Sequence, residues 1–255
     1  MNTEPRRMSV MGCPVDNLSF GETLDLIEGF IKSGKPHQHV VVNADKILKA
    51  KNDPELKNII EKCDIINADG MAVVWASRLL GKPLKQRITG IDLMYALFEM
   101  ANKRGYGVYF LGAKEDIVSS VSGICSQKYP NMRIAGFRNG YWTEPEEYGV
   151  VSAIRESRPD ILFVAISSPK KELFLKKYLL EMNVPFVMGV GGSFDVFAGK
   201  TSRAPFWMQK AGLEWLFRLA QEPGRMWRRY LIGNIKFLNL LAAELFNNVL
   251  KRSKK

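Results

Sequence analysis

Two polar residues with the potential for catalysis follow short apolar strands. Asp69 comes after the apolar residues 65–66 and just before a helix that opens at Gly70, and Asn43 ends the β-branched run 40–42. Open α/β proteins bind their ligands outside the carboxyl ends of the strands. Asp69 is therefore a candidate catalytic carboxylate. The alternative is that Asp69 only caps the helix, because Asp is a favoured capping residue.

Further candidate ligand-binding residues lie at the other expected strand ends and helix starts. A glycine there lets backbone N–H groups meet a phosphate, and a lysine near a positive helix end suits an anion. An exposed aromatic ring in such a loop can stack on a base or sugar, although it could equally pack on the core. These candidates are Thr89, Asp92, Gly112, Gly140, Tyr141, Lys171, Gly191, Gly192 and Asp195.

The sequence does not indicate a metal site. His37 and His39 alternate onto one face of a strand, but no third ligand stands near them. No Asp-x-Asp pair occurs, although many nucleotide-sugar enzymes hold a divalent cation with one. Three cysteines, 50 and 62 residues apart, match no zinc spacing and suggest a reducing cytoplasm. No apolar run follows the two arginines near the N-terminus, so neither a signal peptide nor a membrane span is expected there.

The elements that must position these residues alternate between strand and helix. A Ser-x-x-Glu capping box opens the first expected helix at residues 23–31. The alternation predicts an α/β fold with a Rossmann-like, mostly parallel sheet and helices on both faces. With 255 residues, 46% of them hydrophobic, the chain can bury a sizeable core. The expected strands are residues 8–11, 39–43, 65–66, 108–113, 133–137, 160–166 and 185–190.

The pattern changes to helix alone after residue 205. We expect a catalytic core over residues 1–205 and a helical appendage over residues 206–255, with helices at 207–221 and 225–249 separated by Pro223-Gly224. Polar residues interrupt the second helix, so it is not expected to span a bilayer. One apolar stripe runs along it, made of Leu231, Ile235, Leu238, Ala242, Leu245 and Val249.

The basic charge is concentrated in the appendage. Residues 200–255 hold twelve Lys and Arg against three Glu, a net charge of +9 out of +11 for the whole chain. Such a surface suits an anionic partner, which could be phospholipid, nucleic acid or a diphosphate. Together with the apolar stripe it describes a helix that rests on an anionic membrane surface. The alternative is a helix packed on the core or on a partner subunit.

Several ordered motifs carry a family resemblance over nearly the whole chain. They are VVNADKI with Asn43, NADGMAVVW with Asp69, then RITGIDL, FLGAKED, GYW, SSPKKE, VGGSFDVFAGK and RAPFWMQKAGLEWLFRLAQEP. With these motifs the chain resembles the WecG/TagA/CpsF glycosyltransferases, glycosyltransferase family 26. The resemblance implies a Rossmann-like core with a C-terminal appendage that closes over the site and contacts the membrane.

The resemblance also implies an activity. The enzyme would be inverting and metal-independent, need no cofactor, and act at the inner face of the cell membrane in surface-polysaccharide or teichoic-acid-like synthesis. It would move a sugar of the N-acetylmannosamine type, or a related uronic acid or hexose, from a UDP-sugar to a polyprenyl-diphosphate-linked saccharide. The resemblance implies no nucleic-acid partner, and it leaves open whether the enzyme forms a homo-oligomer. By the motif match, Asp69 is the general base, Asn43 contacts substrate, and Arg218, Arg225 and Arg228 face the diphosphate.

Two departures from the family pattern bear on the donor. Val41 stands where teichoic-acid members have threonine, and Lys171 stands where they have glutamine. A lost hydroxyl and a gained ammonium group suggest a donor other than UDP-N-acetylmannosamine, such as one with a carboxylate. Two other classes stay open: an NAD-dependent sugar-nucleotide enzyme, since residues 189–192 contain three glycines without the G-x-G-x-x-G spacing, and a non-catalytic membrane-binding module.

Overall fold

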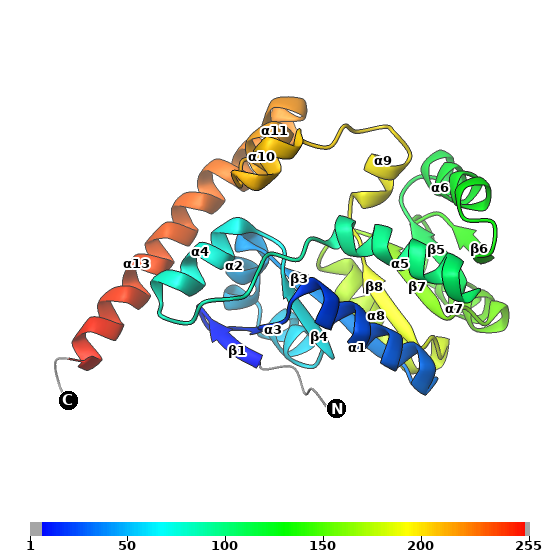
Figure 1. Cartoon of the computed structure of the whole chain (residues 1–255), viewed down its shortest axis with the longest axis horizontal. Helices are drawn as coiled ribbons and strands as arrows, with labels where there is room; N and C mark the ends of the chain where they lie inside the picture. Colours follow the sequence, from blue (N-terminus) through cyan, green and yellow to red (C-terminus); the bar gives the residue numbers. More distant parts are fainter. Residues whose placement is uncertain (1–6, 253–255) are drawn as a thin grey trace.

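A six-stranded parallel sheet forms the centre of the computed structural model, which describes residues 7–252 (Figure 1). Apolar and β-branched residues fill these strands, as expected for parallel strands that are buried on both faces. The predicted α/β fold is thereby confirmed. The strand order is β4-β3-β8-β7-β5-β6, with bounds β3 His37–Val42, β4 Ile65–Ala68, β5 Gly107–Gly112, β6 Arg133–Arg138, β7 Ile161–Ala165 and β8 Phe186–Gly189.

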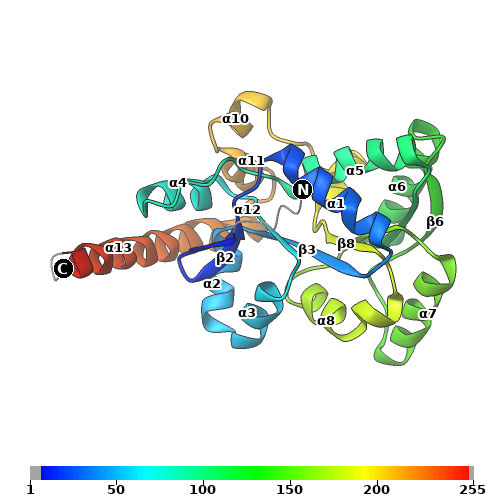
Figure 2. The same ribbon diagram turned by 60° about the horizontal axis from the view of Figure 1, so that its bottom comes forward.

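Helices cover both faces of the sheet, and Figure 2 separates the two layers. One layer holds α1 (Phe20–Ser33), α5 (Gly90–Arg104) and α6 (Glu115–Lys128). Its core includes Phe98, Phe110 and Phe163, which are fully buried and pack against one another. The other layer holds α2 (Ala44–Asn52), α3 (Pro54–Glu61), α7 (Glu147–Ser157) and α8 (Lys170–Met182).

Local capping bonds fix where the helices start after the strands. The expected capping box at Ser19 and Glu22 opens α1. Thr89 caps α5 by accepting a hydrogen bond from the Asp92 N–H, and Asn43 caps α2 by accepting one from the Lys46 N–H at 3.0 Å. Because each bond satisfies an otherwise unpaired N–H of the first turn, the chain leaves the sheet at defined residues.

The N-terminal segment differs from the prediction. The expected strand at residues 8–11 is β1 (Arg7–Val10), but it pairs with β2 (Cys13–Asp16) in an antiparallel hairpin outside the main sheet. Met11 and Gly12, both at positive φ, make the two-residue turn. The prediction missed β2 because Met-Gly is a weak turn signal compared with Asn-Gly. Asp16 ties the hairpin to the sheet by accepting a hydrogen bond from the Ile66 N–H at 2.8 Å.

The first appendage helix is also shorter than predicted. In place of one helix at 207–221, the chain forms α10 (Phe206–Lys210) and α11 (Glu214–Gln221). Gly212, at φ +72°, makes the break, and a Cβ there would lie 3.0 Å from Met71 and Trp75 of α4 (Met71–Leu79). The missing side chain therefore lets this turn approach the core.

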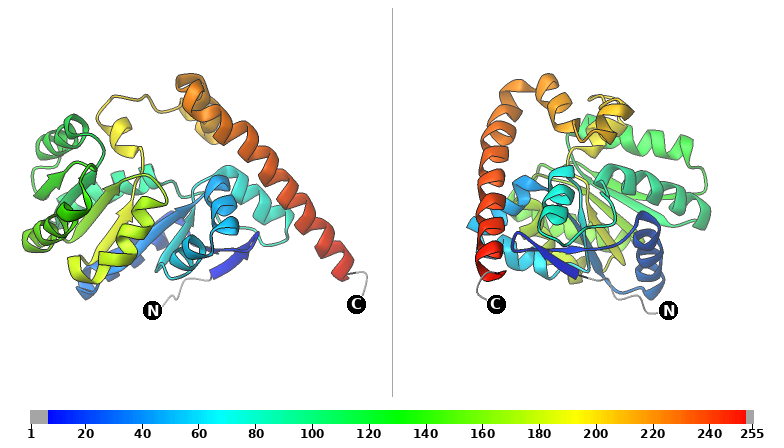
Figure 3. Two further views of the ribbon diagram at one scale, coloured as in Figure 1. Left: turned by 180° about the vertical axis from the view of Figure 1, so that it is seen from behind. Right: turned by 60° about the vertical axis from the view of Figure 1, so that its left-hand side comes forward.

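The last helical stretch runs beside α2 (Figure 3). It consists of α12 (Pro223–Trp227), a π-helical turn (Arg228–Ile232) and α13 (Gly233–Arg252). Phe237 and Leu241 are buried in the core cluster that α2, α3 and the hairpin share. Between residues 7 and 252, no helix is both long enough and apolar enough to cross a bilayer.

Only part of the predicted apolar stripe faces away from this core. Leu231, Ile235 and Leu238 are 50–60% exposed, whereas Leu245 packs against the cluster. The prediction assumed one apolar face, whereas α13 has two, and the packed one is made by Phe237 and Leu241. The side chain of Val249 and residues 253–255 lie outside the described part of the chain.

Candidate active site

A cleft of about 700 Å³ opens at the carboxyl ends of the parallel strands, beneath α11. The strand order brings together side chains that lie far apart in the sequence. Asp69 follows β4 at one end of the cleft, and Tyr141 follows β6 at the other. The predicted residues that line it are Asn43, Asp69, Thr89, Gly140, Tyr141, Lys171, Gly191, Gly192, Asp195 and Arg218.

Asp69 does not serve as a helix cap. The N-cap of α4 is Gly70, and no side chain makes a capping hydrogen bond there. The backbone holds the residue in place instead, because the Asp69 N–H donates to the Val42 carbonyl at 2.9 Å. The carboxylate lines the cleft, where it accepts a hydrogen bond from the Gly90 N–H at the start of α5.

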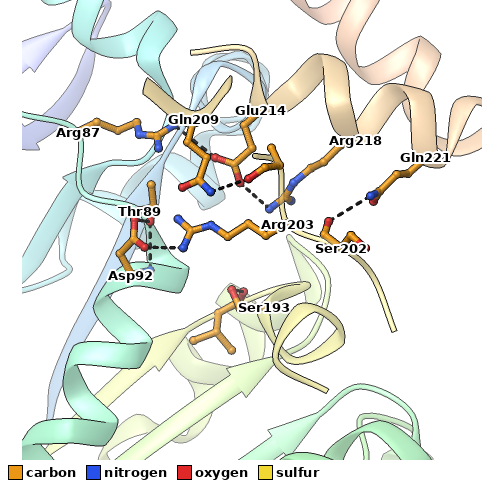
Figure 4. A network of polar contacts seen from close by, with 12 residues as sticks. Arg87, Thr89, Asp92, Ser193, Ser202, Arg203, Gln209, Glu214, Arg218 and Gln221 are labelled. Carbon is orange, nitrogen blue, oxygen red and sulfur yellow. Dashed lines mark hydrogen bonds and ion pairs between the residues drawn. The ribbon is translucent and has the colours of Figure 1, made fainter. Parts of the chain in front are cut away.

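Charged residues from the appendage and the core meet at Glu214 (Figure 4). Glu214 of α11 accepts a hydrogen bond from Arg87 at 3.4 Å and another from Arg218 at 3.4 Å. Arg87 precedes α5, so Glu214 joins the appendage to the core. The charges of Arg87, Arg218 and Glu214 therefore all act on the carboxylate of Asp69, the candidate base.

These neighbours and burial act on the Asp69 carboxyl group in opposite directions. Desolvation raises the pKa of Asp69 above its ordinary value. Arg218 and Arg87 lower this pKa, and Glu214 raises it further. The net effect is an upward shift, as expected for a carboxylate that must take up a proton during a reaction.

Two of the predicted substrate-binding residues, Asp92 and Gly112, are not among the residues that line the cleft. Asp92 accepts a hydrogen bond from the Thr89 hydroxyl at 2.6 Å and forms an ion pair with Arg203 at 2.7 Å. Gly112, at φ +118°, lies so close to β7 that a Cβ would stand 2.5 Å from the Ala165 carbonyl oxygen. This close packing accounts for a glycine at this position.

The three predicted arginines have different places. Arg218 lines the cleft. Arg228 is exposed, with its guanidinium 5.2 Å from the centroid of the Trp227 ring, and it is not among the lining residues. The side chain of Arg225 lies outside the described part of the structure.

The two histidines have different hydrogen-bond partners and do not point at a common group. The His37 Nδ1 lies 2.9 Å from an Asp64 carboxylate oxygen, and the buried His39 Nε2 lies 2.9 Å from the Asn67 carboxamide oxygen. Among residues 7–252, no group of three or more His, Cys, Asp or Glu residues could hold a metal ion.

Sequence reasoning missed several charged residues of the site. Arg87 opens the RITGIDL motif, in which only Thr89 and Asp92 were predicted to bind a ligand. Glu214 lies in an apolar helical pattern. Lys46 pairs with Glu172 at 2.7 Å across 126 residues of sequence. Such long-range pairs leave no local pattern, so spacing alone could not have found them.

A second, smaller cavity of about 320 Å³ lies between the hairpin, α2, α3 and α13. It is lined mainly by apolar side chains, including Met11, Ile47 and Leu240, and contains none of the candidate residues. The larger cleft is therefore the candidate active site.

Comparisons with known proteins identify related sequences. The sequence model of the Glycosyl transferase WecG/TagA/CpsF family matches residues 8–251. A Bacillus spizizenii N-acetylglucosaminyldiphosphoundecaprenol N-acetyl-beta-D-mannosaminyltransferase is 36% identical over 192 residues, which cover 75% of this chain and 74% of the relative. The Bacillus subtilis protein of the same name is 37% identical over 190 residues, which cover 74% of this chain and 73% of that protein.

Proposed function

The chain belongs to the WecG/TagA/CpsF family of glycosyl transferases, and on this basis we propose that it transfers a sugar from a UDP donor to a polyprenyl-diphosphate-linked saccharide. The observation that carries the proposal is a partly buried Asp69 on the wall of a cleft that Arg218 also lines. The names of the two Bacillus relatives support a donor of the N-acetylmannosamine type and a lipid-linked acceptor. The family favours transfer over NAD-dependent chemistry and over a non-catalytic membrane module.

The proposed reaction is a single displacement with inversion. The acceptor hydroxyl oxygen forms a bond to the anomeric carbon of the donor while the bond from that carbon to the diphosphate oxygen breaks. Asp69 takes the hydroxyl proton, and UDP leaves with the electron pair. Arg218, which lines the cleft, stabilises the charge on the leaving diphosphate in this proposal.

Transfer should proceed without a divalent metal, because the cleft offers cationic side chains for the diphosphate. We expect purified enzyme to transfer sugar from UDP-N-acetylmannosamine or a related UDP-sugar to a short-chain lipid-diphosphate acceptor. The rate should be unchanged in EDTA. NMR of the product should show an anomeric configuration opposite to that of the donor, as inversion requires. A rate that collapses in EDTA and returns with magnesium or manganese would refute the metal-free reaction, and an absence of transfer from any UDP-sugar would refute the function.

The exposed face of the appendage fits a role at the inner surface of the cell membrane. Leu231, Ile235 and Leu238 form an apolar strip on α13 and the preceding turn, and Phe206 and Trp207 of α10 are 63–68% exposed. Exposed apolar side chains beside basic residues are typical of peripheral membrane contacts. Homo-oligomer formation through the same face is the alternative.

Replacing Leu231, Ile235 and Leu238 with serine should therefore weaken binding to vesicles that contain phosphatidylglycerol at least tenfold, because each buried aliphatic side chain contributes about 1.5–3 kcal/mol. Co-sedimentation measures this, and thermal unfolding should be unchanged since the three side chains face away from the core. Leu180→Ser is the matched control, because Leu180 on α8 is 79% exposed. Equal binding by the triple variant and the wild type would refute the membrane contact.

A further inference from the structure

One carboxylate in the cleft joins arginines from two parts of the chain. Its two oxygens have different partners: Glu214 Oε2 lies 3.4 Å from Nη1 of Arg87 in the core, and Oε1 lies 3.4 Å from Nη2 of Arg218 in the appendage. The side chains of Glu214 and Arg87 are each only 15% exposed. Because both oxygens belong to one carboxylate, the two guanidinium groups are held next to each other despite their like charge.

These contacts leave both arginines able to bind a further anion. Each contact uses one nitrogen of a guanidinium group that has five N–H donors. Both contacts are also longer than the about 2.7–2.9 Å of a strong charge-assisted hydrogen bond. Two positive charges against one negative charge leave the three groups with a net charge of +1. The Glu214 carboxylate therefore orients the arginines without saturating them.

Helix stability alone does not account for a carboxylate at this place. Glu214 lines the cleft together with Asp69 and Arg218, and its charge acts on the Asp69 carboxyl group. A second carboxylate repels an anionic ligand such as the diphosphate of the proposed donor. An ion pair between residues four apart on one helix stabilises that helix only slightly. The contact with Arg87 of the core is what distinguishes Glu214 from an ordinary helix pair.

The segment that receives this contact also holds the candidate base. Arg87 begins residues 87–92, which lead into the first turn of α5. In the same segment, the Gly90 N–H donates a hydrogen bond to the Asp69 carboxylate. Glu214 and Asp69 are thus attached to one short piece of the core, so this piece sets the place of the appendage helix relative to the base.

The linker that leads into the appendage is attached to the same segment. Asp92 forms an ion pair with Arg203 at 2.7 Å, and the Ser202 carbonyl accepts a hydrogen bond from the Gln221 side chain at 3.2 Å (Figure 4). Helix α11 is therefore fixed at both ends, by its first residue to the core and by its last residue to the linker. Arg218 lies between these two points, so its place in the cleft depends on both attachments.

We propose that Glu214 is a positioning residue for transfer, because its bridge from Arg87 to Arg218 fixes the Arg218 guanidinium relative to Asp69. This inference rests on the proposed glycosyl transfer and adds a residue that acts through Arg218 and not on the substrate. With the bridge in place, Arg218 meets the leaving diphosphate from a preset position. Without it, the guanidinium group must be ordered again at each turnover, which slows the reaction.

The first test is Glu214→Gln, which keeps the size of the side chain but removes the charge that holds the two guanidinium groups together. We expect kcat on a short, water-soluble acceptor to fall at least about tenfold, since a misplacement of about 1 Å can cost 10²-fold. UDP affinity, measured by isothermal titration calorimetry, should rise or stay within about threefold, because a negative charge leaves the cleft. Thermal unfolding should be unchanged.

Glu244→Gln is the matched control for the charge of the appendage. It removes the same charge from α13, but Glu244 lines the smaller cavity and not the cleft. We expect its kcat and its UDP affinity to stay within about threefold of the wild type. An equal loss of kcat in both variants would show that the net charge of the appendage matters and not the bridge.

A double variant separates positioning from a direct role in the reaction. If Glu214 acts through Arg218, then adding Glu214→Gln to Arg218→Gln should lower kcat less than about threefold further, because the guanidinium group to be held is already absent. If the loss is as large in this background as in the wild type, Glu214 acts independently of Arg218 and the proposal is wrong.

Two further results would overturn the proposal. One is a Glu214→Gln variant whose kcat stays within about threefold of the wild type. The other is a variant that loses UDP affinity and thermal stability together with kcat, because Glu214 would then hold the fold and not the arginine. Failure of the wild type to bind UDP or to transfer sugar would instead overturn the proposed function itself, so the two failures can be told apart.

Discussion

Asp69→Asn should lower kcat about 10²–10⁴-fold, the usual contribution of a general base, while the protein folds normally. The amide keeps the size of the side chain but cannot take the acceptor proton. Since no side-chain capping bond starts α4, the substitution removes no structural contact of that kind. Steady-state transfer to a short, water-soluble acceptor measures the effect, and calorimetry should show unchanged donor binding.

The pH profile separates loss of a base from loss of a charge. Wild-type activity requires the deprotonated carboxylate, and burial raises the pKa of Asp69. The rate should therefore fall on the acid side at a pH above the ordinary range of carboxylates, and the variant should lack this limb. Asp45→Asn is the matched control, because Asp45 also lines the cleft but pairs with Lys49 at 3.0 Å. A near wild-type rate for Asp69→Asn, or an equal loss in Asp45→Asn, would contradict the assignment.

Arg218→Lys should lower kcat about 10²-fold on the soluble acceptor, although the charge is retained. A guanidinium presents a planar pair of donors to phosphate oxygens, which an ammonium cannot reproduce. Loss of one donor to a developing negative charge typically costs 10²–10³-fold. Stopped-assay kinetics measure kcat, and binding to anionic vesicles should stay nearly constant because the net charge does not change.

Arg228→Lys supplies the comparison. Arg228 lies exposed against Trp227, so we expect its replacement to change kcat less than threefold. The result that would disprove the role of Arg218 is full activity of Arg218→Lys. The backbone N–H groups near Gly191 of the cleft would then be the alternative donors to the leaving diphosphate.

Residues whose role is set by their immediate neighbours were predictable from the sequence. The capping box at Ser19, the apolar strands and their parallel class all follow from local patterns, and the structure confirms them. Because carboxyl ends of parallel strands share one edge, the same patterns placed Asn43 and Asp69 in one cleft. The catalytic and binding roles of these residues are predictions that the variants described above will test.

Contacts between distant segments were not predictable. Glu172 with Lys46, and Glu214 with Arg87, are joined only by the tertiary fold. The two faces of α13 were missed for a related reason, since hydrophobic spacing identifies an apolar face but not the surface that will cover it. The break at Gly212 depends likewise on the approach of α4.

The packing of α13 has a consequence for how the protein unfolds. Phe237 and Leu241 share one buried cluster with Ile47 of α2 and Leu56 of α3, and the first turn of α2 supplies Asn43 and Lys46 to the cleft wall. Elements that share a core lose their stability together, as one cooperative unit. The C-terminal helix is therefore not a detachable anchor: proteolytic loss of α13 would also loosen the catalytic wall, and a chain that has lost it would be inactive even with all its cleft residues present.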